Sequence, residues 1–217
     1  MNNYVVLDLE MCKTHKSDEN EQMKYKHELI QIGAVALNDE YEIIDTFVTY
    51  VSPEYGSIDR FINRLTGISK KDTEKAPSAK QALNSFAAWL PENVQLIAWS
   101  NNDERQIKSE LARKGIEIAK LSDTFGSWID CQQLFGDKLN TRRKYRLSEA
   151  LSLANIYYVD GAHDALVDAR NTAKLFKKLC TEQELRLSPY LMTEDDMKAV
   201  SFNPFASYSK AKACSSF

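Results

Sequence analysis

The chain has 217 residues, of which 43% are hydrophobic and 27% are charged, and its formal net charge at pH 7 is −3. This composition fits a globular domain with additional segments, and no apolar run approaches the ~20 residues of a transmembrane helix. The N-terminus shows neither a basic region nor a small-residue cleavage site, so we expect no signal peptide and no membrane partner. Its 4 cysteines are widely spaced, which predicts a cytoplasmic protein and excludes a disulfide scaffold or a zinc cluster.

The first part of the chain predicts three strands. Residues 3–10 are apolar and β-forming, and a charged loop follows over residues 13–27. Residues 29–37 and 41–51 predict two further strands. Because only the short turn at residues 38–39 separates them, we expect an antiparallel hairpin.

The rest of the chain predicts alternating helices and strands. Helices are expected over 57–65, 78–89, 103–114, 147–154 and 164–180, and strands over 94–99 and 127–131. Ser78 and Gln81 have the spacing of a capping box, Gly115 is suited to end a helix, and Asp164 to begin one. A loop is expected over 66–72. Strands in a meander followed by strands alternating with helices predict an α/β fold, with a mixed sheet covered by helices on both faces.

Four carboxylates and one histidine lie at predicted strand ends, helix starts and an adjoining loop, and together they form a candidate site. Asp8 and Glu10 are separated by one residue at the end of a predicted strand, so they share one face of it. Asp103 opens a helix after the next buried strand, and Asp168 lies one turn into the last helix, five residues after His163. Each also has an ordinary explanation, because acids are common in solvated loops and first helical turns, and loop histidines are common on surfaces.

Taken together, the set predicts a hydrolytic site for phosphodiesters. Acids at several strand ends and helix starts converge at one edge of a mixed sheet, and their oxygens are the ligands that Mg2+ or Mn2+ prefers. Two such ions would clamp a scissile phosphate, one activating a water and one stabilising the leaving oxygen. A histidine suits removal of a proton from that water at neutral pH.

The D-x-E pair, the central Asp103 and the H-x4-D pair resemble the motif set of the DEDDh exonucleases. The stretches HELIQIGAV, RLTGIS, AWSNND and GAHDALVDARNTAKL are most similar to the branch that contains the enhanced-RNAi exonucleases and the bacterial sporulation-inhibitor-like exonucleases. The resemblance covers about residues 3–180. It implies a ribonuclease H-like fold, with a mixed five-stranded sheet flanked by helices, in a domain over 1–182. Residues 183–217 would form a tail of unknown role.

The resemblance also assigns roles to the five residues. Asp8, Glu10 and Asp168 would bind a first Mg2+ or Mn2+ ion. Asp8 would bridge to a second ion, which Asp103 supports. His163 would be the general base, and the product would be a 5′-mononucleotide released from a 3′ end.

Four further residues match positions that contact substrate in the resembling family. Met11 would pack against the terminal base, and Leu65 and Thr66 would receive the terminal nucleotide. Trp99 matches a tryptophan of the same branch, although a core aromatic at the end of a strand is an equally good interpretation. Asn102 stands where many relatives have an aromatic residue, which leaves substrate preference open.

The predicted function is a metal-dependent 3′–5′ exonuclease acting on single-stranded RNA or DNA 3′ ends, with a slight preference for RNA. The basic run over 138–146 either contacts phosphates near the cleft or forms a solvated loop. One alternative is a non-catalytic nucleic-acid-binding or interaction module. Another is a proofreading subunit of a DNA polymerase, which would contact its protein partner through the aromatic tail.

Overall fold

The computed structural model describes residues 3–14, 27–158 and 163–188, and all structural statements refer to these residues. Most of the charged loop predicted over 13–27, and the predicted tail beyond residue 188, lie outside them. The sheet has the order β3-β2-β1-β4-β5. Its strands are β1 (Asn3–Lys13), β2 (His27–Leu37), β3 (Ile43–Tyr50), β4 (Val94–Ala98) and β5 (Ile129–Asp130).

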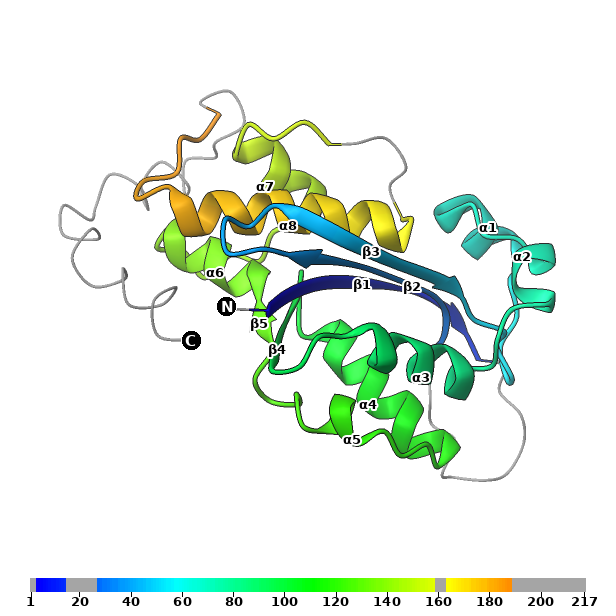
Figure 1. Ribbon diagram of the computed structural model, residues 1–217. Coiled ribbons are helices and arrows are strands. Elements are labelled where there is room, and N and C mark those ends of the chain that lie inside the picture. The colour runs from blue at the N-terminus through cyan, green and yellow to red at the C-terminus, as the bar shows by residue number, and fades with distance from the viewer. Residues whose placement is uncertain (1–2, 15–26, 159–162, 189–217) are drawn as a thin grey trace.

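The sheet is mixed, as predicted. β1 pairs antiparallel with β2, and β2 pairs antiparallel with β3, which confirms the hairpin. On its other side β1 pairs parallel with β4, and β4 pairs parallel with β5. β1 is therefore the central strand, and it runs through the sheet toward the end at which α1 and α2 lie (Figure 1).

Helices cover both faces of the sheet. They are α1 (Arg60–Thr66), α2 (Lys70–Glu74), α3 (Ala79–Trp89), α4 (Asn102–Lys114), α5 (Ala119–Ser122), α6 (Cys131–Lys138), α7 (Leu147–Leu153) and α8 (Ala165–Thr181). Figure 1 shows α6, α7 and α8 on one side of the sheet, α3, α4 and α5 on the other, and α1 and α2 beyond one end. This arrangement confirms the predicted α/β fold class.

Two hydrophobic clusters enclose the sheet, and β1 contributes alternate residues to them. Val5, Leu7 and Leu9 pack in the cluster that holds α3 and α4, whereas Tyr4 and Val6 pack in the cluster that holds α6, α7 and α8. Full burial of an aliphatic or aromatic side chain contributes about 1.5–3 kcal/mol, so both helical layers are firmly attached to the central strand.

Local capping signals explain several helix ends. Ser78 and Gln81 form the predicted capping box of α3, and Gly115 ends α4 with a φ of 57°. The loop predicted over 66–72 is partly wrong, because α2 begins within it. Ser69 and Asp72 form a capping box there, with the Asp72 carboxylate accepting the Ser69 backbone N–H at 2.8 Å.

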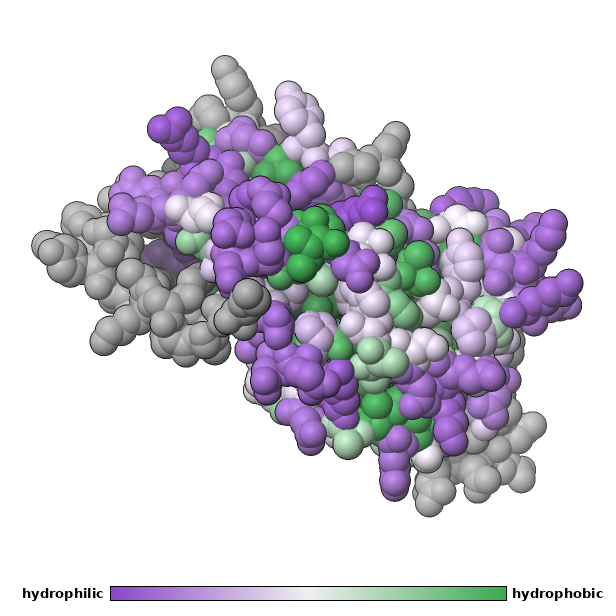
Figure 2. All heavy atoms as spheres, in the orientation of Figure 1, coloured by the Kyte–Doolittle hydropathy of each residue, from purple (hydrophilic) through white to green (hydrophobic). Residues whose placement is uncertain are grey.

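β3 is an edge strand with exposed apolar side chains. These are Ile43, Ile44, Val48 and Tyr50. Figure 2 shows hydrophobic surface in the middle of the face that β3 crosses in Figure 1. The strand therefore packs against the core less completely than β1 and β2, whose residues are mostly buried.

The chain stays attached to the domain after α8. The N–H of Ser188 donates to the carbonyl of Leu153 at 2.8 Å, and Leu185 and Leu187 pack beside the cluster around α7. Among the described helices, none is long and apolar enough to cross a membrane.

Candidate active site

Asp8 and Glu10 project from the same face of β1, the face that α8 covers. In the antiparallel register with β2, Asp8 lies opposite Gly33 and Glu10 lies opposite Gln31. The register shifts directly after Glu10, which marks an irregularity where β1 leaves the regular ladder. Glu10 is only 8% exposed and Asp8 is half-buried, so the pair does not lie in a solvated loop.

Asp103 reaches the same region from the opposite layer. It lies in the first turn of α4, directly after β4, and it is 6% exposed. A backbone hydrogen bond from Leu9 of the central strand favours its ionised form. The parallel pairing of β4 with β1 thus brings Asp103 to the carboxyl end of β1.

Asp168 comes from the first turn of α8 and is held by two donors. The backbone N–H of His163 donates to its Oδ2 at 3.1 Å, and the Tyr158 hydroxyl donates to its Oδ1 at 2.5 Å. One ligand atom each of Glu10, His163 and Asp168 lie within 4.8 Å of one another. Two carboxylates and an exposed imidazole are therefore close enough to share one cation.

Close packing of α8 on β2 makes this meeting possible. A Cβ at Gly33 would lie 2.2 Å from the Leu166 nitrogen and 2.3 Å from the Ala165 carbonyl carbon, so no larger residue fits. Gln31 fastens the same helix end: its Nε2 donates to Oδ2 of Asp164 at 3.0 Å, and its Oε1 accepts from the Ala165 N–H at 3.0 Å. The other oxygen of Asp164 caps α8, as predicted, by accepting the N–H of Val167.

The acids repel one another electrostatically. Burial, followed by the charges of Asp168, Asp103 and Asp164, raises the pKa of Glu10 from 4.5 to about 8. Burial and the neighbouring acids also raise the pKa of Asp8 well above its usual value, and burial raises the pKa of Asp103 to about 7. Binding of a proton reduces the repulsion between the buried carboxylates, and binding of a cation would have the same effect.

The donor set fits divalent cations with a preference for oxygen ligands. Asp8, Glu10, Asp103 and Asp168 would hold them, since these carboxylates converge from three elements, and the pKa values of Asp8, Glu10 and Asp103 are raised where no cation balances their charge. His163 stands at the rim of this group with its side chain exposed. The five residues predicted from the sequence are therefore brought together.

The four predicted substrate-binding residues lie in different settings. Leu65 is 37% exposed on α1, and Met11 is partly buried beside the core. Thr66 is buried, and its hydroxyl donates to the Ile62 carbonyl at 2.9 Å. Trp99 is partly buried, with its ring 6.4 Å from that of Phe135, which gives it a packing role whatever its role toward substrate.

Sequence reasoning did not single out Gln31, Gly33 or Tyr158. Gln31 and Gly33 stood in the HELIQIGAV motif, but their function depends on α8, more than 130 residues later. Tyr158 lies 10 residues before Asp168, and burial together with its hydrogen bond to that acid raises the pKa of its hydroxyl. A tyrosine five residues before the motif histidine was the available signal.

Some basic side chains of the run over 138–146 make contacts within the protein. Lys138 donates to the Leu179 carbonyl, and Arg143 pairs with Glu149 and stacks over the Tyr145 ring at 4.6 Å. The other basic side chains of this run are Arg142, Lys144 and Arg146, all exposed.

Comparison with known proteins identifies relatives that carry the same kind of domain. A family model described as exonuclease (RNase T) matches residues 5–176. Human ERI1 exoribonuclease 2 is 30% identical over 182 residues, covering 71% of this chain and 26% of that protein. The zebrafish (Danio rerio) ERI1 exoribonuclease 2 is 28% identical, covering 82% of this chain and 35% of that protein. The chain thus spans about a quarter to a third of these relatives.

Solved structures share the fold. The nuclease domain of 3'hExo, described as a DEDDh family member bound to rAMP, has a TM-score of 0.67 and 21% identity, covering 86% of this chain and 96% of that one. E. coli exonuclease I in complex with a dT13 oligonucleotide has a TM-score of 0.64 and 16% identity, covering 84% and 42%. With the family match and the converging acids, the chain belongs to the RNase T-type exonuclease family, and the predicted membership of the DEDDh 3′–5′ exonucleases is confirmed.

Proposed function

We propose that the chain removes 5′-mononucleotides from the 3′ ends of single-stranded nucleic acid, RNA in preference to DNA, by two-cation hydrolysis. The observation that carries this proposal is the convergence of Glu10, His163 and Asp168 within 4.8 Å, beside Asp8 and Asp103. Membership of the exonuclease family supports the reaction class, and the similarity to relatives named exoribonucleases supports RNA.

The residues divide the chemistry among themselves. Asp8, Glu10, Asp103 and Asp168 would hold two Mg2+ or Mn2+ ions. Bound there, the ions would lower the pKa of the attacking water and neutralise charge that develops on the phosphate. His163 is exposed next to Asp168, and its imidazole would take the proton of that water.

The exposed apolar face of helix α1, formed by Phe61 and Leu65, would be one wall of the substrate site. Leu65 and Phe61 are exposed on it one turn apart, at 37% and 62%, so both present apolar surface in the same direction. Tyr50, the last residue of β3, lies near both α2 and the start of α8, because burial and then the charges of Asp72 and Asp164 raise the pKa of its hydroxyl. We assign the terminal nucleotide to this wall, with Leu65 and Met11 against its base.

The test is a nuclease assay with matched substrates. Single-stranded RNA and DNA of one sequence, labelled at the 5′ end, are incubated with Mg2+ or Mn2+. We expect stepwise shortening from the 3′ end and about tenfold faster cleavage of RNA, the effect of about one hydrogen bond to a 2′-hydroxyl.

Asp8→Asn keeps the shape of the side chain and should reduce the rate on the order of 100-fold or more, because it removes a charge from the cation site. Equal activity of wild type and Asp8→Asn, or none in either, would refute the proposal.

The similarity to a DNA polymerase III of PolC type from Mycoplasmopsis pulmonis, 26% identical over 69% of this chain and 10% of that protein, favours proofreading as a second candidate. A proofreading enzyme should remove a mismatched 3′ nucleotide of duplex DNA faster than a paired one. In this case the tail over 183–217 would contact the polymerase, and its deletion should abolish association without changing cleavage of single strands.

A further inference from the structure

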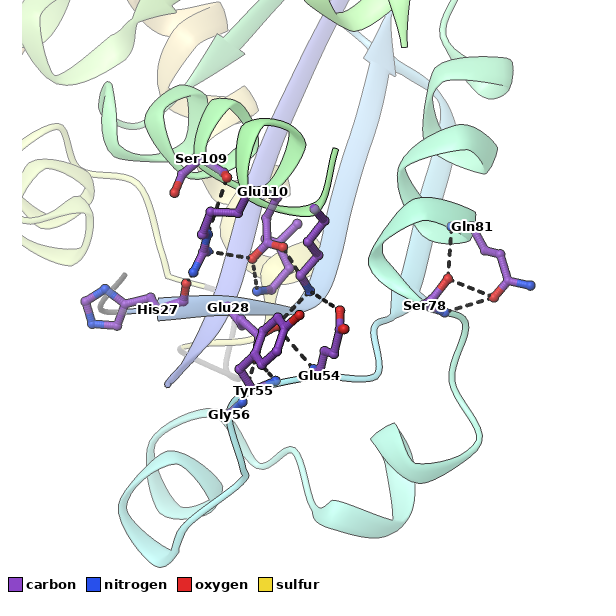
Figure 3. Close-up of polar contacts among 12 residues, drawn as sticks. His27, Glu28, Glu54, Tyr55, Gly56, Ser78, Gln81, Ser109 and Glu110 are labelled. Atoms are coloured by element: carbon purple, nitrogen blue, oxygen red, sulfur yellow. Dashed lines mark hydrogen bonds and ion pairs between the residues drawn. The ribbon is translucent and has the colours of Figure 1, made fainter. Parts of the chain in front are cut away.

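A second group of charged residues is buried at the end of the sheet that supports α1. Its central residue is Glu28, the second residue of β2, which is completely buried. Its carboxylate accepts three successive backbone N–H groups, from Glu54 at 3.2 Å, Tyr55 at 2.8 Å and Gly56 at 2.6 Å. Figure 3 shows Glu28 facing this backbone segment.

The charge of Glu28 is balanced from α4. Nζ of Lys114, in the last turn of that helix, lies 2.7 Å from Glu28 and 3.1 Å from Glu110. Glu110 also pairs with Arg113 at 3.2 Å and accepts the N–H of Leu29 at 3.1 Å. Two acids and two bases, all nearly inaccessible to solvent, thus join α4, β2 and the loop 54–56. Charge-assisted hydrogen bonds of this kind are strong when every partner is present, and removing one partner is costly.

This network fixes the segment that leads into α1. A Cβ at Gly56 would lie 2.6 Å from Cys12 Sγ, so the loop is pressed directly against the end of β1. Two further attachments are an antiparallel bridge between Gly56 and Thr14 and a small hydrophobic cluster, in which Ile62 and Ile68 pack on Cys12 and Ile30. The apolar contact beneath α1 is small, so the three hydrogen bonds to the buried Glu28 are a major part of what attaches the segment before α1 to the sheet.

We propose that Glu28 is a positioning residue for substrate, which holds loop 54–56 so that the exposed face of α1 keeps a fixed position relative to the acidic site. This inference rests on the proposed function, because it uses the wall formed by Leu65. The same helix α4 carries Asp103 in its first turn and Lys114 in its last, so one rigid element supports both the acid and the wall.

The test compares Glu28→Gln with Glu92→Gln. In Glu28→Gln, the introduced amide would meet the three N–H donors with one oxygen in place of two and would lose the charge that pairs with Lys114. Glu92 is exposed and pairs with Lys120 on the surface, so the control makes the same chemical change without freeing a backbone segment.

We expect Glu28→Gln to raise KM for single-stranded oligonucleotides about tenfold and to speed amide exchange at residues 54–56 by at least about tenfold. Hydrolysis of bis(4-nitrophenyl) phosphate, which has no base to contact α1, and calorimetric affinity for Mn2+ should stay within about twofold. Glu92→Gln should leave all four quantities unchanged.

An unchanged KM alongside faster exchange would overturn the inference, and so would a parallel loss of hydrolysis of both substrates. If the wild type cleaves neither substrate, the proposed function is refuted. Unchanged amide exchange at residues 54–56 in Glu28→Gln would separately refute the proposal that Glu28 holds this loop. If Glu28→Gln does not fold, Lys114→Gln tests the same residue by removing the cation that pairs with Glu28, and the same rise in KM with faster exchange at residues 54–56 is expected.

Discussion

His163 combines an unusual backbone with a side chain at the acidic site. Its φ of 66° lies in the left-handed region, which Asn and Asp tolerate better than most residues. Its N–H donates to Asp168 at 3.1 Å, so this conformation serves to orient an acid as well as to present the imidazole. The strained geometry at a residue with a proposed chemical role is consistent with a functional constraint.

The first prediction separates these two roles. We expect His163→Asn to fold as stably as the wild type, because Asn adopts this conformation readily, and to lower kcat about 10²–10⁴-fold through loss of the general base. His163→Ala should lose the same activity and, in thermal melts, about 1 kcal/mol of stability as well. If His163→Asn retains full activity, another group removes the proton.

At the scale of elements, the position of α8 decides whether the acids meet. Gly33→Ala would push a methyl group into the first turn of α8. We expect it to cost about 1–3 kcal/mol of stability, and to weaken Mn2+ binding because Asp168 moves away from Glu10.

Gly115→Ala is the matched control, since Gly115 has a φ of 57° and open space around its Cβ position. It should cost about 1 kcal/mol in the same melts and leave Mn2+ binding unchanged in calorimetry. A similar loss of Mn2+ affinity in both variants would show that general destabilisation, rather than the contact with α8, explains the effect.

Elements with a clear local signal were predictable from the sequence. The strands of the meander and α8 show strong apolar periodicity, and the ends of α3 and α4 have capping residues. The helix α2 was missed although Ser69 and Asp72 have capping-box spacing, because only five residues follow that pattern. The helix α6 was missed because it directly continues β5, with Asp130 both ending the strand and capping the helix.

The candidate site was predictable where its residues form motifs. Asp8 and Glu10 on a strand, and His163 and Asp168 at a helix start, have spacings that constrain geometry locally. Contacts that depend on packing between distant segments were not predictable, such as the pairing of Glu28 with Lys114. Such contacts follow from the register of β2 and the axis of α4, neither of which a single sequence specifies.

For the whole molecule, the same packing that stabilises the domain forces like charges together. β1 supplies Asp8 and Glu10, while Asp103 and Asp168 belong to helices on opposite faces of the sheet. The elements that carry these acids pack in the two hydrophobic clusters, and this packing fixes the backbone positions of the acids. The cation site is therefore built at a cost in stability that depends on pH.

The final prediction concerns this dependence. The pKa of Glu10 is raised from 4.5 to about 8, chiefly by burial and then by Asp168 and Asp103. The folded state therefore binds the Glu10 proton more tightly than the unfolded state does. The resulting contribution to the free energy of unfolding is fully present below pH 4.5 and is lost as the pH rises through 8. With EDTA, Glu10→Gln should therefore melt at the same temperature as the wild type near pH 4.5 and several degrees higher near pH 8, at about 2–4 °C per kcal/mol. Added Mn2+ should raise the wild-type melting temperature near pH 8 more than that of Glu10→Gln, because the cation binds the ionised carboxylates of the folded state. A difference in melting temperature between the two proteins that does not change with pH would show that ionisation of Glu10 beside the other acids does not destabilise the fold. An equal effect of Mn2+ on both proteins would show that Glu10 does not contribute to cation binding.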